Sequence, residues 1–156
     1  MSRHLAQLNV GRLAYDIDDP AVADFVAGRQ MIDRIAAAAP GFVWKPERGF
    51  GDAEAERIGS DPRLLYSLSV WESAEALAHF VWRTLHKRFV QRRAEWFVAP
   101  DEAHLVLWWV ALGHRPSLSE ALGRLAQLRQ HGDTDHTFGW ARLAEISGIT
   151  SDRSMA

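Results

Sequence analysis

The chain has 156 residues, of which 47% are hydrophobic and 24% charged, a size and balance that predict one globular domain with its own core and exclude two ordinary domains. The net charge of −2 at pH 7 argues against nucleic acid or a membrane as partner, and no apolar stretch reaches the roughly 18 residues that cross a bilayer. The absence of cysteine excludes disulfides and thiolate zinc sites, and the lack of a signal-peptide pattern predicts a cytoplasmic protein.

Residues 4–13 predict the first strand, because side chains of different polarity alternate along them. Ala6, Leu8 and Val10 share one face, which we expect to meet the main core. Gln7 and Asn9 lie next to each other on the opposite face. That face is expected either to be solvated or to line a site.

A helix is predicted over residues 19–39, because Asp19 can cap its first turn and Pro20 fits the first helical position. Its apolar stripe is formed by Val22, Phe25, Val26, Ile32 and Ile35. After Pro40–Gly41, residues 42–47 predict a second strand that carries Phe42 and Trp44 on one side. The glycine-rich segment 49–62 then predicts a long loop.

Residues 63–71 predict the third strand, in which Ser67, Ser69 and Trp71 share one face. Ser73 is a favourable N-cap for a helix that is expected to continue, with a bend near Thr84, to residue 97. Residues 104–112 predict the fourth strand. Since that strand is apolar on both faces, we expect it to be covered on both sides.

The capping box Ser117–Glu120 predicts a further helix to about Leu128, and the pattern fades after Gly132. We therefore expect one domain over residues 1–135, including this C-terminal helix, and a tail over residues 136–156.

The predicted order of elements is β-α-β-β-α-β followed by a helical extension, which is the ferredoxin-like arrangement of an α+β protein. Two helices would cover one face of a four-stranded antiparallel sheet. The other face also needs cover, because Phe42, Trp44 and Trp71 cannot all lie in water. A second copy of the same sheet is the expected cover, which predicts a homodimer.

The chain resembles the domain-of-unknown-function family 3291 of the dimeric α/β-barrel superfamily. The motifs behind this resemblance span roughly residues 4–130 and are His4–Asn9, Pro40–Trp44, Ser69–Ser73, Arg92–Phe97, Leu107–Val110 and Gly113–His114. The resemblance implies sheets paired across a two-fold axis with a cavity beside them. Relatives in the superfamily include cofactor-free monooxygenases, haem-dependent enzymes, isomerases and polyketide cyclases, and the fold does not select among them.

The helix after Ser73 is expected to present one stripe of ionisable and aromatic residues, namely His79, Trp82, His86, Phe89, Arg93 and Trp96. His86 is interpreted as a general base, as a haem ligand, or as a histidine bonded to a backbone carbonyl. Arg93 is interpreted either as an anion clamp or as the partner of Glu72 or Glu95 in a salt bridge. His79 is expected to face solvent. No metal-binding motif is present, and His86 would bind a metal only if the protein holds haem.

If the first and third strands are neighbours, the polar side chains of Gln7, Asn9, Ser67 and Ser69 cluster. We expect four tryptophans to contribute to the same substrate-binding region: Trp44, Trp71, Trp82 and Trp108. The combination predicts a pocket for a small, partly polar and aromatic ligand. The alternative is a polar dimer core that water satisfies.

These features predict a small-molecule enzyme of the monooxygenase, isomerase or cyclase kind, with His86 and Arg93 as catalytic residues and without a cofactor. No nucleotide-binding or serine-hydrolase motif is present. One alternative is an enzyme that binds haem through His86. Another is a non-catalytic dimer that binds a ligand or serves assembly.

Overall fold

The computed structural model describes residues 3–46, 57–59, 61–84 and 86–147, and the side chains of Arg57, His86, Ile146 and Ser147 lie outside the described part. In chain order the elements are β1 (Arg3–Arg12), the short 3-10 helix η1 (Pro20–Val22), α1 (Ala23–Ala38), β2 (Phe42–Trp44), β3 (Arg57–Ile58), β4 (Asp61–Trp71), α2 (Ala74–Arg83), α3 (His86–Gln91), α4 (Arg93–Trp96), β5 (Leu105–Ala111), α5 (Leu118–His131) and α6 (Trp140–Ser147).

The strands form one antiparallel sheet in the order β2-β4-β1-β5, with β3 pairing separately with β4. The central strand β1 pairs with both β4 and β5, and its register sets Gln7 opposite Ser69 and Asn9 opposite Ser67. The predicted α+β ferredoxin-like fold is therefore confirmed. The predicted loop 49–62 overlaps the described strands β3 and β4, and its residues 49–56 and 60 lie outside the described residues.

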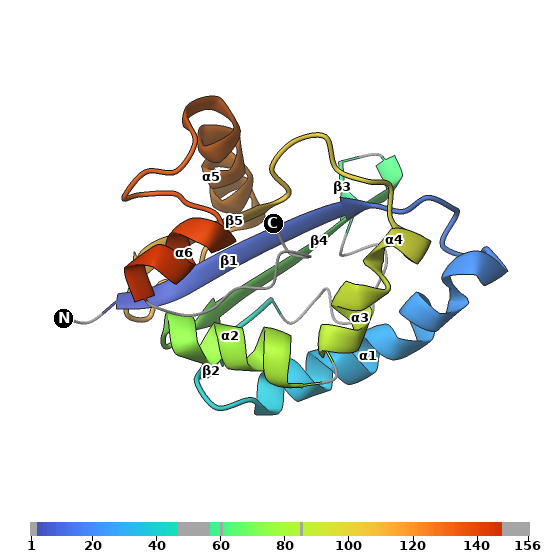
Figure 1. Ribbon diagram of the computed structural model, residues 1–156, viewed down its shortest axis with the longest axis horizontal. Coiled ribbons are helices and arrows are strands. Elements are labelled where there is room, and N and C mark those ends of the chain that lie inside the picture. Colours follow the sequence, from blue (N-terminus) through green and yellow to red (C-terminus); the bar gives the residue numbers. More distant parts are fainter. Residues whose placement is uncertain (1–2, 47–56, 60, 85, 148–156) are drawn as a thin grey trace.

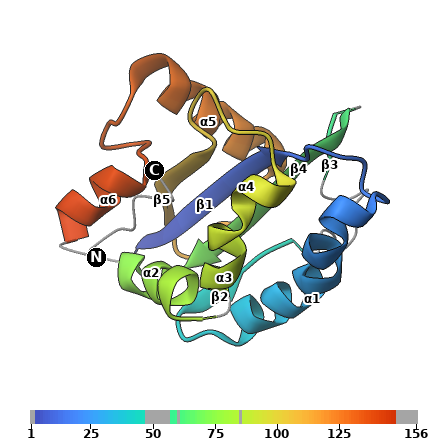
Figure 2. The same cartoon turned by 45° about the vertical axis from the view of Figure 1, so that its right-hand side comes forward.

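The two faces of the sheet are covered by different helices, as Figures 1 and 2 show. On one face Leu5, Trp71 and Leu107 pack in a core with residues of α1, α2 and α6. On the other face Leu8 and Val70 pack with α5, whose buried residues are Ala121, Leu125 and Leu128.

This arrangement corrects two expectations from the sequence. The face with Ala6, Leu8 and Val10 does not meet the main helical layer but packs against α5. The face with Gln7 and Asn9 lies under the helices. Cover for the second face comes from within the chain, because the capping box at Ser117 starts a helix long enough to lie across β5 and β1. Since α5 provides this cover, a second copy is no longer required for it, and the homodimer stays a prediction.

The predicted long helix after Ser73 is broken at Thr84. This residue has extended backbone angles, φ −123° and ψ −176°, and its hydroxyl donates to the carbonyl oxygen of Phe80. Such a bond from a β-branched residue competes with continuation of the helix. Because an extended residue resets the helix rotation, the predicted single stripe from His79 to Trp96 is wrong, and α2, α3 and α4 follow separate directions.

Residues 137–143 belong to the core, although residues 136–156 are predicted from the sequence to be a tail. Phe138 is fully buried and exchanges two backbone hydrogen bonds with Leu107, of 2.8 and 3.0 Å, on the outer side of β5. Trp140 and Leu143 of α6 are buried in the same core. This segment joins the core because its large apolar side chains would otherwise be exposed to water. Residues 148–156 of the predicted tail lie outside the described residues.

None of the described helices has the length and apolarity that a membrane crossing requires. The described residues also contain no group of three or more metal-binding side chains close enough to hold an ion.

Gly41 fixes the connection between α1 and β2. It has φ +82°, and a Cβ at this position would lie 2.4 Å from the Cβ of Ala76 on α2. Its carbonyl accepts a hydrogen bond of 2.8 Å from the backbone N–H of Glu72, which ties the turn to the end of β4.

We expect Gly41→Ala to lower the free energy of unfolding by about 2–5 kcal/mol, because the left-handed backbone and the clash with α2 both add to the cost. Gly113→Ala is the matched control, since Gly113 also has φ +82° but open space around a Cβ. It should cost only about 1–2 kcal/mol. Urea unfolding measures both, and equal losses would contradict the role of the contact with Ala76.

Candidate functional site

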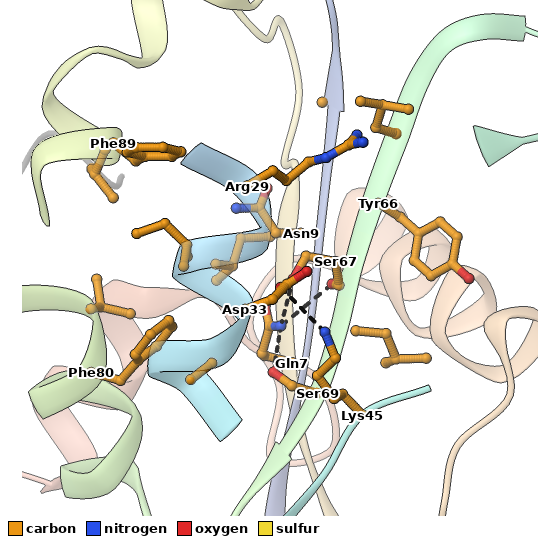
Figure 3. A pocket seen from close by; sticks show the side chains of 18 of the residues that line it. Gln7, Asn9, Arg29, Asp33, Lys45, Tyr66, Ser67, Ser69, Phe80 and Phe89 are labelled. Atoms are coloured by element: carbon orange, nitrogen blue, oxygen red, sulfur yellow. Dashed lines mark hydrogen bonds and ion pairs between the residues drawn. The ribbon is translucent and has the colours of Figure 1, made fainter. Parts of the chain in front are cut away.

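A cavity of about 210 Å³ lies between the sheet and the helices, on the face of β1 and β4 that carries the polar side chains (Figure 3). The polar and charged residues along its wall are Gln7, Asn9, Arg29, Asp33, Lys45, Ser67, Ser69, Arg93 and His104. Aromatic residues of α1, α2, α3, α4 and α6 contribute much of the remaining wall. A mostly apolar hollow with a few polar groups is typical of a small-molecule site.

The floor of the cavity is a hydrogen-bonded strip formed by β1 and β4. Gln7 Nε2 donates to Ser69 Oγ at 2.7 Å, and Trp71 Nε1 donates to the same oxygen at 2.9 Å. A serine hydroxyl has two acceptor positions and one proton. Since both acceptor positions are used, the Ser69 hydroxyl can act only as a donor. The predicted cluster of Gln7, Asn9, Ser67 and Ser69 is confirmed as a structural feature, while its role in substrate binding stays a prediction.

The polar atoms at the cavity that lack a hydrogen-bond partner among the described residues include one on β1 and one on α6. One is Oδ1 of Asn9, which Figure 3 shows on the helical side of β1. The other is the indole nitrogen of Trp140 on α6. A buried polar group without a partner costs about 1–3 kcal/mol, so both atoms are candidates for contact with a ligand of complementary polarity.

Arg93 lies at the end of the cavity where β1 finishes. Its Nη2 donates to the carbonyl of Val10 at 3.4 Å, and its guanidinium lies 4.9 Å from the centre of the Phe97 ring. Burial lowers the pKa of Arg93. The predicted salt bridge to Glu95 is made by its neighbour Arg92 instead.

Asp33 and Lys45 form an ion pair of 3.2 Å at the cavity wall, between α1 and the residue after β2 (Figure 3). Burial raises the pKa of Asp33, although Lys45 and Arg29 act in the opposite direction. The second carboxylate oxygen of Asp33 is buried and has no partner among the described residues. This carboxyl group can therefore accept either a hydrogen bond or a proton.

Sequence reasoning missed Arg29, Asp33 and Lys45. The available signal was on α1, where Arg29 and Asp33 are four residues apart and interrupt the apolar stripe that contains Phe25 and Ile32. Charged residues inside such a stripe face the same interior space as their apolar neighbours. Lys45 gave no comparable signal, since it fell inside the predicted strand 42–47, whereas β2 ends at Trp44.

Trp44 and Trp108 do not line the cavity. Trp108 pairs with Ala6 and Trp44 with Val70, so both lie on the opposite face from Gln7 and Ser69. The expectation that they lie beside the polar cluster is wrong, because neighbouring positions of a strand point to opposite sides. Trp108 Nε1 instead donates to Glu120 Oε2 of α5 at 3.1 Å.

The remaining predicted residues lie on α2 and α3. Trp82 packs against Trp140 with ring centres 6.0 Å apart and is not part of the cavity wall. His79 is exposed, as predicted. His86 begins α3, but its side chain lies outside the described residues. Its predicted roles as general base or haem ligand therefore stay predictions.

His104 precedes β5 at the Arg93 end of the cavity, and its carbonyl accepts a 2.8 Å hydrogen bond from the backbone N–H of Val10. The pKa of His104 is lowered to about 4, mainly by burial and in smaller part by the positive charges of Arg93 and Arg129. The folded protein therefore holds this imidazole neutral at pH 7.

We expect the free energy of unfolding to fall as the pH drops from about 6.5 towards 4, because the unfolded chain binds a proton at His104 that the folded chain refuses. His104→Gln should remove this part of the pH dependence. Urea unfolding at several pH values measures it, with His136→Gln at an exposed position as control. Parallel stability curves for the wild type and His104→Gln would contradict the prediction.

Comparisons with known proteins agree with this architecture. A family model described as "Domain of unknown function (DUF3291)" matches residues 4–153. No curated protein matches the chain. The solved structure of PA3566 from Pseudomonas aeruginosa is similar at a TM-score of 0.50 and 14% identity, over 75% of this chain and 98% of that one.

A second solved structure, of a proposed antibiotic biosynthesis monooxygenase from Chloroflexus aurantiacus J-10-fl, has a TM-score of 0.44 and 14% identity, over 74% of this chain and 98% of that one. At these identities, the likeness to PA3566 supports the fold alone.

Proposed function

We propose a function from the cavity itself, because the chain belongs to the DUF3291 family, whose description as a domain of unknown function assigns no activity. The protein is a small-molecule enzyme of the dimeric α/β-barrel type. It acts on a small, partly polar, aromatic substrate that lies between the sheet and the helices. Its first chemical step removes a proton beside a carbonyl or phenol oxygen of the substrate.

One observation carries this proposal: the cavity places a donor-only hydroxyl and a carboxyl group of raised pKa on the walls of the same space. Ser69 has both acceptor positions occupied by Gln7 and Trp71, so its proton is free to bind an oxygen atom of the substrate. Asp33 has one oxygen held by Lys45 and the other buried without a partner among the described residues.

In the proposed step, Asp33 accepts a proton from an acidic C–H or O–H group of the substrate. The electron pair left behind moves onto the substrate oxygen, which becomes an enolate or phenolate. Ser69 stabilises this oxygen through its O–H, and the positive charge of Arg93 at the end of the cavity favours the anion. Such an anion is the common starting point for isomerases, cyclases and cofactor-free monooxygenases.

Asp33 is proposed for this role because its carboxyl lies on the cavity wall, has a pKa raised by burial and keeps one oxygen without a partner among the described residues. His86 remains the acid–base group predicted from the sequence, and haem binding depends on the same residue. No described contact favours haem over an enzyme without a cofactor.

The homodimer is also part of the proposal. Beside α5, the apolar side chains of Val43, Trp44 and Tyr66 are only partly buried. Figure 3 shows Tyr66 pointing away from the cavity side of the sheet. A partner that packs on this half of the face would complete its cover, which supports the predicted pairing.

We expect the protein to accelerate exchange of the acidic C–H protons of 2-tetralone, an aromatic ketone, with deuterium from the solvent. Loss of the acid–base group in Asp33→Asn should slow this exchange about 100-fold or more. Ser69→Ala should slow it about 100-fold, because an oxyanion donor is lost. Proton NMR in D₂O measures the rate.

The matched control is Asp24→Asn, which removes a solvent-exposed carboxylate from the same helix and should leave the rate unchanged. Exchange no faster than in buffer for the wild type, or an Asp33→Asn variant as fast as the wild type, would contradict the proposed step.

A further inference from the structure

Arg92 and Arg93 are consecutive arginines with opposite environments. Arg92 is exposed and contacts two carboxylates, Glu95 at 2.9 Å and Asp24 at 3.0 Å. Arg93 is partly buried at the cavity and contacts no carboxylate among the described residues; its one hydrogen bond there is the 3.4 Å contact with the carbonyl of Val10. The arginine that has lost more water is therefore the one without a counter-charge.

A cation withdrawn from water is costly unless an anion compensates it, and burial lowers the pKa of Arg93 accordingly. The carboxylate of Asp33 is already engaged by Lys45. Nothing else described at this end of the cavity is negatively charged. A negative group of the ligand would supply the missing charge.

Gly11 makes the room in which Arg93 lies. A Cβ at this position of β1 would come within 3.2 Å of Arg93 Nη2 and 2.7 Å of Phe97 Cδ1. Its φ is not in the left-handed region, so a turn does not explain the glycine. A glycine inside a strand often marks a place where another group approaches the backbone closely. Here the closest group is the Phe97 ring, and the Arg93 guanidinium lies beside it.

Aromatic rings surround this end of the cavity. Phe25 contacts Phe97 with ring centres 5.1 Å apart and Trp96 at 5.6 Å, and Phe89 contacts Trp96 at 5.2 Å. All four rings line the cavity. They provide flat apolar surfaces for an aromatic ligand and keep the dielectric low around the guanidinium, which strengthens its attraction for an anion.

Asn9 lies two residues from Gly11 on the same face of β1, and its buried Oδ1 has no partner among the described residues. A carbonyl oxygen in this state requires a donor. A ligand that offers an anion to Arg93 and an O–H group to Asn9 satisfies both residues at once.

We propose that the ligand of this cavity is an aromatic carboxylate with a ring hydroxyl group that is not adjacent to the carboxylate, whose carboxylate binds Arg93 and whose hydroxyl donates to Asn9. The inference rests on the proposed function for the choice of the cavity, and it adds the chemical class of the substrate. A planar guanidinium matches a carboxylate through two parallel hydrogen bonds, which favours this anion over a spherical one.

The test uses 3-hydroxybenzoate and its neutral counterpart 3-hydroxybenzamide, which share the ring and the hydroxyl group. Isothermal titration calorimetry should show 3-hydroxybenzoate binding the wild type about tenfold or more tightly than 3-hydroxybenzamide. Arg93→Gln should bring the two affinities within about twofold, and Arg93→Lys should restore part of the preference because it keeps the charge. Arg92→Gln is the matched control and should keep the full preference.

Two further readouts locate the binding. NMR signals of the indole N–H groups of Trp71 and Trp140 at the cavity should shift with 3-hydroxybenzoate, whereas that of Trp108 on the opposite face should not. Gly11→Ala, which displaces Arg93 without removing its charge, should weaken 3-hydroxybenzoate more than 3-hydroxybenzamide. Asn9→Leu should reduce the advantage of 3-hydroxybenzoate over benzoate, because the hydroxyl of 3-hydroxybenzoate is too far from its own carboxylate to bond it and can donate to Asn9.

Equal affinities for 3-hydroxybenzoate and 3-hydroxybenzamide in the wild type would overturn the proposal, as would a preference that survives in Arg93→Gln or no binding of either probe. The exchange of 2-tetralone separates this result from the proposed function, because that ketone carries no carboxylate. Exchange that persists while the preference for 3-hydroxybenzoate is absent refutes the ligand class alone. A preference for 3-hydroxybenzoate without any exchange refutes the proposed proton transfer alone.

Discussion

The pairing of β1 with β4 is the constraint on which the rest of the structure depends. Because side chains alternate along a strand, the register that sets Gln7 opposite Ser69 sends Gln7, Asn9, Ser67 and Ser69 to one side. It sends Ala6, Leu8 and Val70 to the other. A shift by one residue would bury the polar strip under α5 and turn the apolar residues into the cavity. The site and the core are thus specified by one set of backbone hydrogen bonds.

The sequence was sufficient for the parts that depend on local periodicity. The four predicted strands and the caps at Asp19, Ser73 and Ser117 follow from alternation and capping chemistry, although Asp19 caps η1 rather than α1. The polar cluster could also be predicted from the sequence, since its formation requires only that the first and third predicted strands lie next to each other. What the sequence could not supply was tertiary, namely that α5 lies on the second face of the sheet. The interruption at Thr84 is local, since Thr84 bonds to Phe80 four residues earlier, and a bend near Thr84 was expected from the sequence.

The cavity residues that sequence reasoning missed share a physical cause. Asp33 and Arg29 are charged residues of a kind that usually faces solvent on a helix, and their place inside the apolar stripe of α1 was the one sign that they face the cavity. Trp108 looked like a wall of the site because it is aromatic and adjacent to residues that face the cavity. A single step along the strand was enough to place it against Glu120. Residue type therefore suggests chemistry, while rotation about the element axis decides where that chemistry is available.

The bridge between Phe138 and Leu107 has a consequence for the solubility of the sheet. β5 is an outermost strand, and the backbone groups of Leu107 would otherwise be open to pairing with another chain. Because the segment around Phe138 already pairs with these backbone groups, it prevents another chain from adding a strand at this edge and forming fibres. A chain shortened at residue 135 would lose this pairing together with three buried side chains, Phe138, Trp140 and Leu143, and would present both a bare strand and a bare apolar surface.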